Sequence, residues 1–120
     1  MVAIDTPQAA AEERNKLSKA LRDSIEEMRN AGLDRAEAEH QYQDRYNTAL
    51  LKSERSSDAQ RKAEAQQAAA SLSKAFLKGE VIERYWQVRV RAIETDLKAL
   101  MTVAAGIRRE FEEAHRGPNA

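Results

Sequence analysis

The strongest pattern in the chain is an apolar repeat in its last third. Eight residues alternate at spacings of four and three, the heptad pattern of a helix that buries one seam against another helix. The spacing predicts a coiled-coil-like helix over about 80–114, and Met101 and Val103 widen the seam so that the helix should contact two neighbours there. We call the repeat and Met101 the terminal seam and predict that it is a protein interface: Trp86, Val90, Ile93, Leu97, Leu100, Met101, Ala104, Ile107 and Phe111.

A helix of about 35 residues is about 52 Å long, whereas a compact domain of this size has a radius of gyration near 14 Å. A preceding helix of about 24 residues spans only about 36 Å. We therefore expect part of the terminal seam to be buried by a second copy of the chain. Gly106, beside Ala104 and Ala105, indicates either close approach of another backbone or a tolerated glycine.

Helix-end signals predict a first helix over about 7–30. Thr6 suits an N-cap and Pro7 suits the first helical position, where a missing N–H costs nothing. Asn30-Ala31-Gly32 supplies residues that tolerate the left-handed conformation of a helix end. The buried face of this helix is expected to carry Leu17, Leu21, Ile25 and Met28.

Two more helices are predicted between the first and the last. Asp34 with Glu37 forms a capping box that would start a helix over about 35–54. The polar segment 53–58 predicts a break, and Ser57 can cap an alanine-rich helix over 58–78 that Gly79 ends. Because alanine buries little area, that helix should pack close to another backbone.

Composition agrees with an all-helical chain. Ala, Glu, Lys, Leu and Arg make up 65 of the 120 residues, whereas Val, Ile and Thr contribute only 14. We predict an all-α protein, an elongated bundle of three or four helices whose C-terminal helix is long. It would form a single helical domain over 7–114, with tails at 1–6 and 115–120.

Charge and cysteine content narrow the setting. The net charge is zero and there is no cysteine, so nothing favours a secreted fold held by disulfides. No run of 18 apolar residues exists, and residues 1–7 lack the basic and apolar regions of a signal peptide. We expect a soluble, cytoplasmic protein that does not enter a membrane.

A basic row raises the alternative of nucleic-acid binding. The row consists of Arg84, Arg91 and Lys98, which are spaced by seven residues and begin beside Tyr85 and Trp86. The segment 58–78 is also locally basic. Glu80 and Glu94 are placed to pair with the row, and 80–120 carries seven basic and seven acidic residues, so direct nucleic-acid binding is the less favoured hypothesis. Under that alternative the contacting residues would be Arg61, Lys62, Lys74, Lys78, Arg84 and Arg91.

The sequence contains little that indicates an enzyme. Glu37 with His40 and Glu112 with His115 have the Glu-x-x-His spacing of di-metal bundles. A four-helix order places the two pairs at opposite ends; a single helix over 34–78 would place them at the same end, with His115 in a fraying terminus. There is no phosphate-binding glycine loop and no nucleophile constellation. We predict no catalytic residue, no metal and no cofactor.

The order of segments resembles a known group of proteins. An amphipathic first helix leads through Ala49-Leu50-Leu51-Lys52-Ser53-Glu54 into an Arg- and Ala-rich helix. Tyr85-Trp86 then opens a long helix that ends with Ala105-Gly106-Ile107-Arg108-Arg109-Glu110-Phe111. This order is similar to small all-helical accessory proteins that phages of Gram-positive bacteria encode among early genes, near recombination and single-strand-handling functions.

The resemblance implies a cytoplasmic protein of an infected bacterial cell, either an adaptor for DNA-processing machinery or an inhibitor of a host system. The residues themselves favour a non-enzymatic interaction module, because narrow amphipathic stripes of this length need a second chain to bury them. We therefore predict a homo-oligomer, a dimer or larger, and the resemblance implies in addition a protein partner in DNA metabolism.

Overall fold

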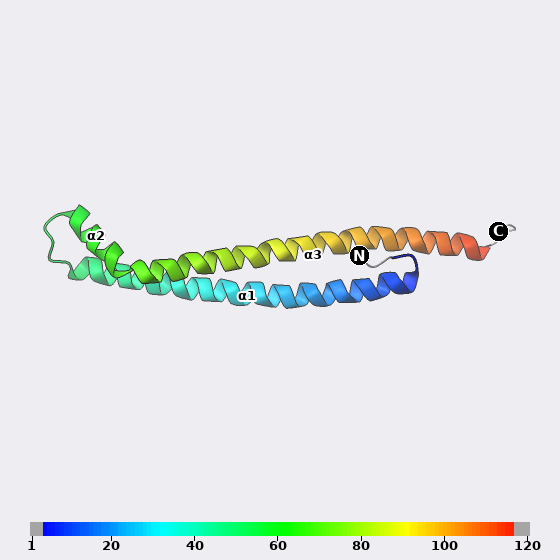
Figure 1. Ribbon diagram of the computed structural model, residues 1–120, viewed down its shortest axis with the longest axis horizontal. Coiled ribbons are helices and arrows are strands. Elements are labelled where there is room, and N and C mark those ends of the chain that lie inside the picture. The colour runs from blue at the N-terminus through cyan, green and yellow to red at the C-terminus, as the bar shows by residue number, and fades with distance from the viewer. Residues whose placement is uncertain (1–3, 117–120) are drawn as a thin grey trace. The chain divides into compact units, whose positions relative to one another are not determined.

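A computed structural model describes residues 4–116, and within that range the chain forms three helices and no strand. These are α1 (Pro7–Lys52), α2 (Asp58–Ala68) and α3 (Ala70–Arg116), coloured in chain order in Figure 1. The prediction of an all-α chain with a long C-terminal helix is confirmed. The expected tails lie partly outside the described residues, namely 1–3 and 117–120.

The predicted helix end at Asn30-Ala31-Gly32 is wrong, because α1 continues through this segment to Lys52. The Asp34 capping box consequently lies in the middle of a helix. A glycine inside a helix costs about 1 kcal/mol relative to alanine, which packing of an apolar face can offset. That offset is available here, since Met28 is half-buried and Ala31 is buried on the same helix.

The predicted helix end at Gly79 is also wrong. Instead α3 begins at Ala70 and runs through Gly79, so the expected boundary between 58–78 and 80–114 does not exist. A Cβ placed on Gly79 would lie 3.2 Å from the Cα of Arg35. The glycine therefore serves close helix packing rather than helix termination.

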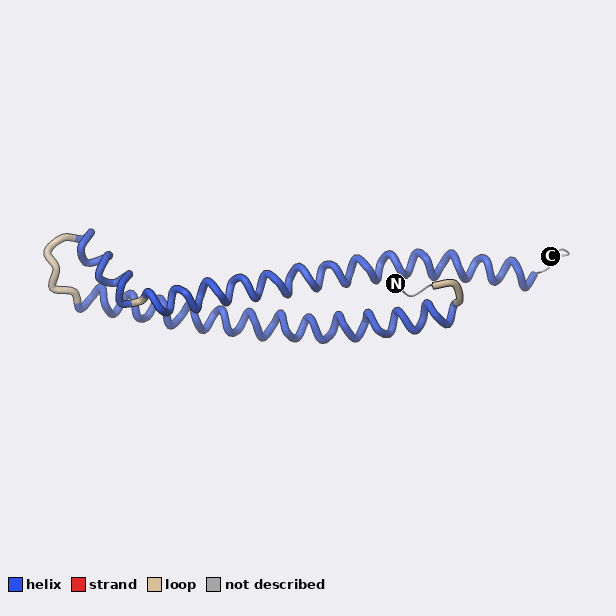
Figure 2. The backbone as a smooth tube through the Cα atoms, viewed as in Figure 1, coloured by secondary structure: helices blue, strands red, loops and turns tan. Residues whose placement is uncertain are grey.

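The predicted polar break is confirmed. Residues 53–57 are not helical, and Figure 2 shows them as the loop between α1 and α2. The hydroxyl of Ser57 accepts a hydrogen bond from the Gln60 amide at 3.2 Å, which is the expected N-cap. However, α2 ends at Ala68 rather than at 78, because Ala69 takes a non-helical turn before α3.

The two outer helix ends follow their predictions closely. The hydroxyl of Thr6 accepts a hydrogen bond from the Ala9 amide at 3.0 Å, so Thr6 caps α1 with Pro7 in the first helical position. The last helix was predicted to end at 114 and ends at Arg116. A difference of two residues is within the usual uncertainty of a helix boundary.

The chain divides into two compact units, each built from parts of the long helices. Unit 1 contains residues 4–25 and 88–116, and unit 2 contains residues 26–87. In unit 2, Arg35 pairs with Glu83, whereas Tyr42 stacks on Phe76 with ring centroids 6.4 Å apart. A step of seven residues forward on α1 thus matches seven backward on α3, so the two helices are antiparallel there.

The inner faces of both helices follow a heptad spacing. In unit 1 the buried residues are Ala10 and Ser24 of α1 together with Val90, Ile93, Leu100 and Ile107 of α3. In unit 2, Arg35 and Tyr42 of α1 contact Gly79, Glu83 and Phe76 of α3. At the same heptad spacing, Ala31 is buried, and Ala38 and Trp86 are half-buried. Small residues on α1 thus accompany large residues on α3 in unit 1, while unit 2 carries an ion pair within its seam.

Candidate interaction surface

Most of the terminal seam is buried inside the chain itself. Val90, Ile93, Leu100 and Ile107 are at most 8% exposed. They are buried in unit 1, where the first part of α1 lies alongside α3 (Figure 1). The expectation that part of the seam lacks a neighbour in the chain depended on a first helix that ended near residue 30; because α1 has 46 residues, it does not hold for these four positions. Leu97 and Ala104 are half-buried in unit 1, and Trp86 is half-buried in unit 2.

The remaining members of the terminal seam point outward. Met101 is 64% exposed and Phe111 is 39% exposed, and Val103 beside them is 46% exposed. The predicted contact with two neighbouring helices at this level is therefore not made within residues 4–116. Of the two alternatives for Gly106, the tolerated glycine agrees with the structure, because a Cβ there would meet nothing within 4 Å in the described chain.

A second apolar row on α3 escaped the sequence analysis. Leu77, Val81 and Tyr85 follow one another at spacings of four residues in unit 2, and they are 53%, 66% and 56% exposed. The spacing was visible in the sequence, but the stricter terminal seam had already been assigned as the single apolar face of this helix.

Basic side chains surround this row. Lys74 and Lys78 precede and flank it, and Arg84 lies on its other side by helical spacing; all three are exposed. The structure shows no ion pair for these three side chains in the part of the chain that it describes. The neutralisation of Arg84 by Glu80 that the spacing suggested is thus not formed as an ion pair. We call Leu77, Val81 and Tyr85 the docking patch.

A different basic residue on the same helix pair is fully engaged. Arg35 of α1 donates from Nε to Glu83 of α3 and from Nη1 to Glu39, 2.8 Å away. The hydrogen bond and charge of Glu83, followed by the charge of Glu39, raise the pKa of the Arg35 guanidinium. Because two carboxylates already bind it, Arg35 holds α1 to α3 and is not available to a ligand.

The other basic residues predicted for nucleic acid do not form one group with the docking patch. Arg61 of α2 is half-buried and donates from Nη2 to the carbonyl of Leu50 at 3.5 Å, at the end of α1. Lys62 is exposed on α2, and Arg91 is exposed in unit 1. The structure therefore places Lys74, Lys78 and Arg84 around the docking patch and leaves the rest of the set elsewhere.

The two Glu-x-x-His pairs belong to different units. Glu37 and His40 lie on α1 in unit 2, and both are exposed. Glu112 and His115 lie at the end of α3 in unit 1, where His115 Nδ1 is 2.7 Å from the Phe111 carbonyl oxygen. Within the described residues, no group of three or more His, Cys, Asp or Glu side chains is placed to hold a metal ion.

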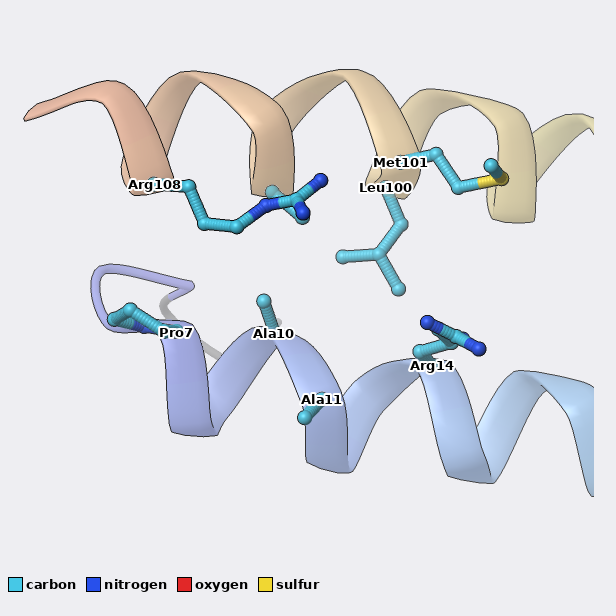
Figure 3. Close-up of a pocket in the computed structure, with 8 residues that line it drawn as sticks. Pro7, Ala10, Ala11, Arg14, Leu100, Met101 and Arg108 are labelled. Carbon is cyan, nitrogen blue, oxygen red and sulfur yellow. The ribbon is translucent and has the colours of Figure 1, made fainter. Parts of the chain in front are cut away.

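Unit 1 carries two open grooves between α1 and α3. One, of about 260 Å³, is lined by apolar residues and by Arg14 and Arg108, as Figure 3 shows. The other, of about 390 Å³, is lined by apolar residues and by Glu13 and Asp96. We call them the basic groove and the acidic groove, after the charged residues in their linings.

Comparison with known protein families, curated proteins and solved structures finds no match to this chain. Among the described residues, no helix combines the length and the apolar character that crossing a bilayer requires.

Proposed function

We propose that this protein is a helical protein–protein interaction module that binds an amphipathic helix of a partner through the docking patch. The observation that carries the proposal is the exposure of three large apolar side chains in a row on α3. Each is more than half exposed. Other positions of α3 in unit 2, Phe76, Gly79 and Glu83, contact α1. Apolar anchors at spacings of about one turn suit a helix laid along them.

The surroundings of the docking patch specify the chemistry of that partner. Lys74, Lys78 and Arg84 give the patch a basic rim, so the complementary helix carries acidic residues beside its apolar face. Leucine and valine favour a protein over nucleic acid, because bases stack on aromatic rings and gain little from aliphatic side chains. The resemblance to phage accessory proteins supports a role as an adaptor or as an inhibitor of a host protein.

The test uses a labelled synthetic peptide of about 21 residues, with leucine at the a and d positions and glutamate at e and g, against the full chain. We expect fluorescence anisotropy to show binding in the micromolar range. Val81→Asp should weaken it at least about tenfold, because an acidic group in the contact repels the peptide and is desolvated. Leu51→Asp is the matched control, since Leu51 is 81% exposed and lies on α1 outside the patch.

Three results would contradict the proposal. The first is an equal effect of Val81→Asp and Leu51→Asp, and the second is stronger binding of a peptide with lysine at e and g. The third is tight, steeply salt-dependent binding of single-stranded DNA that Lys74→Glu abolishes. That last outcome would assign the surface to nucleic acid instead.

A further inference from the structure

The basic and acidic grooves lie in the same unit and carry opposite charge. The apolar part of the basic groove includes Ala10 and Leu100, with Arg14 on α1 and Arg108 on α3 (Figure 3). The apolar part of the acidic groove includes Leu17 and Val103, with Glu13 and Asp96. Each groove thus presents an apolar surface with two like charges, and the sign differs between the two.

The helical positions explain why the two grooves face different directions. Glu13 and Arg14 are adjacent on α1 and therefore point about 100° apart around the helix axis. Met101 and Val103 are two residues apart on α3 and therefore point about 160° apart. The exposed Met101 lines the basic groove and the exposed Val103 lines the acidic groove. Each groove consequently has one large, exposed apolar side chain to offer to a partner.

We infer that these grooves join copies of this chain head to tail, the basic groove of one copy against the acidic groove of the next. The charge pattern selects this arrangement over a two-fold dimer. A two-fold axis places the same groove of both copies together, which would set arginine against arginine or carboxylate against carboxylate. A head-to-tail contact pairs opposite charges and covers Met101 and Val103 at once.

The inference goes beyond the proposed function and uses a different surface. It retains the expectation of self-association but moves it from the buried terminal seam to the two grooves. A head-to-tail contact closes into a ring or extends with concentration, depending on the rotation between neighbouring copies.

The experiment measures the weight-average mass of the full chain by sedimentation equilibrium at low salt. We expect a mass above the 13.5 kDa of one chain that falls toward 13.5 kDa at about 0.5 M salt, where charge pairing is screened. Arg14→Glu/Arg108→Glu has two acidic grooves and Glu13→Arg/Asp96→Arg has two basic ones, so each variant alone should remain at 13.5 kDa. An equimolar mixture of the two should associate again.

Matched controls reverse the same number of charges elsewhere in unit 1. Lys19→Glu/Arg22→Glu and Glu12→Arg/Glu113→Arg change exposed residues outside both groove linings, so both controls should associate like the unaltered chain. Far-ultraviolet circular dichroism confirms that each variant keeps its helices.

The inference is overturned if the unaltered chain stays at 13.5 kDa at several hundred micromolar, or if the mixed variants remain monomeric. Loss of association in the controls, or association of either reversed variant alone, would overturn it as well. Val81→Asp separates this result from the proposed function, because it removes the docking patch and should leave association intact. If Val81→Asp abolishes association, copies pair through the docking patch instead.

Discussion

Gly79 of α3 lies directly against the backbone of Arg35 of α1. A Cβ on Gly79 would be 3.2 Å from the Arg35 Cα and 3.4 Å from its Cβ, closer than ordinary packing allows. One turn further along α3, Glu83 binds the guanidinium of the same arginine. A missing side chain and an ion pair on adjacent turns thus hold the two helices close and fix their relative register.

Alanine substitutions should separate packing from helix propensity at the glycines. Gly106→Ala should raise the free energy of unfolding by about 1 kcal/mol, because its new methyl group meets open space and alanine favours the helix. Gly79→Ala should lower the free energy of unfolding, although alanine favours the helix there as well, because the new methyl group displaces the Arg35 backbone. Urea unfolding followed by circular dichroism measures both, and an equal gain at the two positions would refute the close approach.

These glycines also show what sequence could not decide. Gly32 and Gly79 carry the same local signal as a helix C-terminus, yet both are internal to long helices. Gly79 is part of a helix that packs against Arg35, a residue about 44 positions away in sequence. A pattern of neighbouring residues does not record such a contact. By contrast, Thr6 and Ser57 cap helices as predicted. The Asp34 capping box carries the same kind of local signal but lies inside α1, so a capping signal alone does not decide a helix end.

The interaction surface was partly predictable for the same reason. The terminal seam was found correctly as an apolar face, but its partner was mistaken, because the length of α1 depended on Gly32. The docking patch could be predicted only with the knowledge of which face of α3 is covered by α1. Once that face is known, the spacing of Leu77, Val81 and Tyr85 identifies the free one.

The ion pair between Arg35 and Glu83 should fix the register of α1 against α3 more than it raises the stability of the fold. Glu83→Gln should lower the melting temperature, because Arg35 then loses its main charged partner. The double variant Arg35→Met/Glu83→Leu should melt at or above the temperature of the unaltered chain, since apolar replacements can match a partly buried ion pair. A double variant that melts below the unaltered chain would show that the pair supplies net stability.

The same pair predicts a particular pH dependence. Glu83 raises the pKa of Arg35, so its stabilising contribution is complete below the ordinary arginine pKa and is lost only as pH rises through the still higher folded value. The melting-temperature difference between the unaltered chain and Arg35→Gln should therefore stay constant from about pH 7 to pH 10. In Arg35→Lys the advantage over Arg35→Gln should shrink only as pH rises above about 10.4, the ordinary lysine pKa, and therefore at lower pH than for arginine. Thermal melts across and above this range provide the test.

The short helix α2 should be sensitive to side-chain volume at one face. Ala65 is completely buried and Ala63 is exposed on the same helix. Ala65→Leu should lower the free energy of unfolding by about 1–3 kcal/mol through overpacking. Ala63→Leu should change it by no more than about 0.5 kcal/mol. Equal effects in urea unfolding would mean that Ala65 is not packed against the long helices.

Leu100 and Met101 provide the sharpest test of where the terminal seam is buried. Leu100 is 5% exposed in unit 1, whereas its neighbour Met101 is 64% exposed. Leu100→Ala should lower the free energy of unfolding by about 2–5 kcal/mol, and Met101→Ala should leave it within about 0.5 kcal/mol.

The decisive feature is the dependence of the Leu100→Ala loss on protein concentration. At about 0.5 M salt the charged grooves of different copies do not pair, so if α1 of the same chain covers Leu100 the loss is the same at about 2 and about 200 micromolar, because no association equilibrium contributes. If a second copy covered this position, the unaltered chain would gain stability with concentration and the loss from Leu100→Ala would grow with it. Urea unfolding at both concentrations distinguishes the two, and a concentration-dependent loss would return the terminal seam to the role of an intermolecular interface.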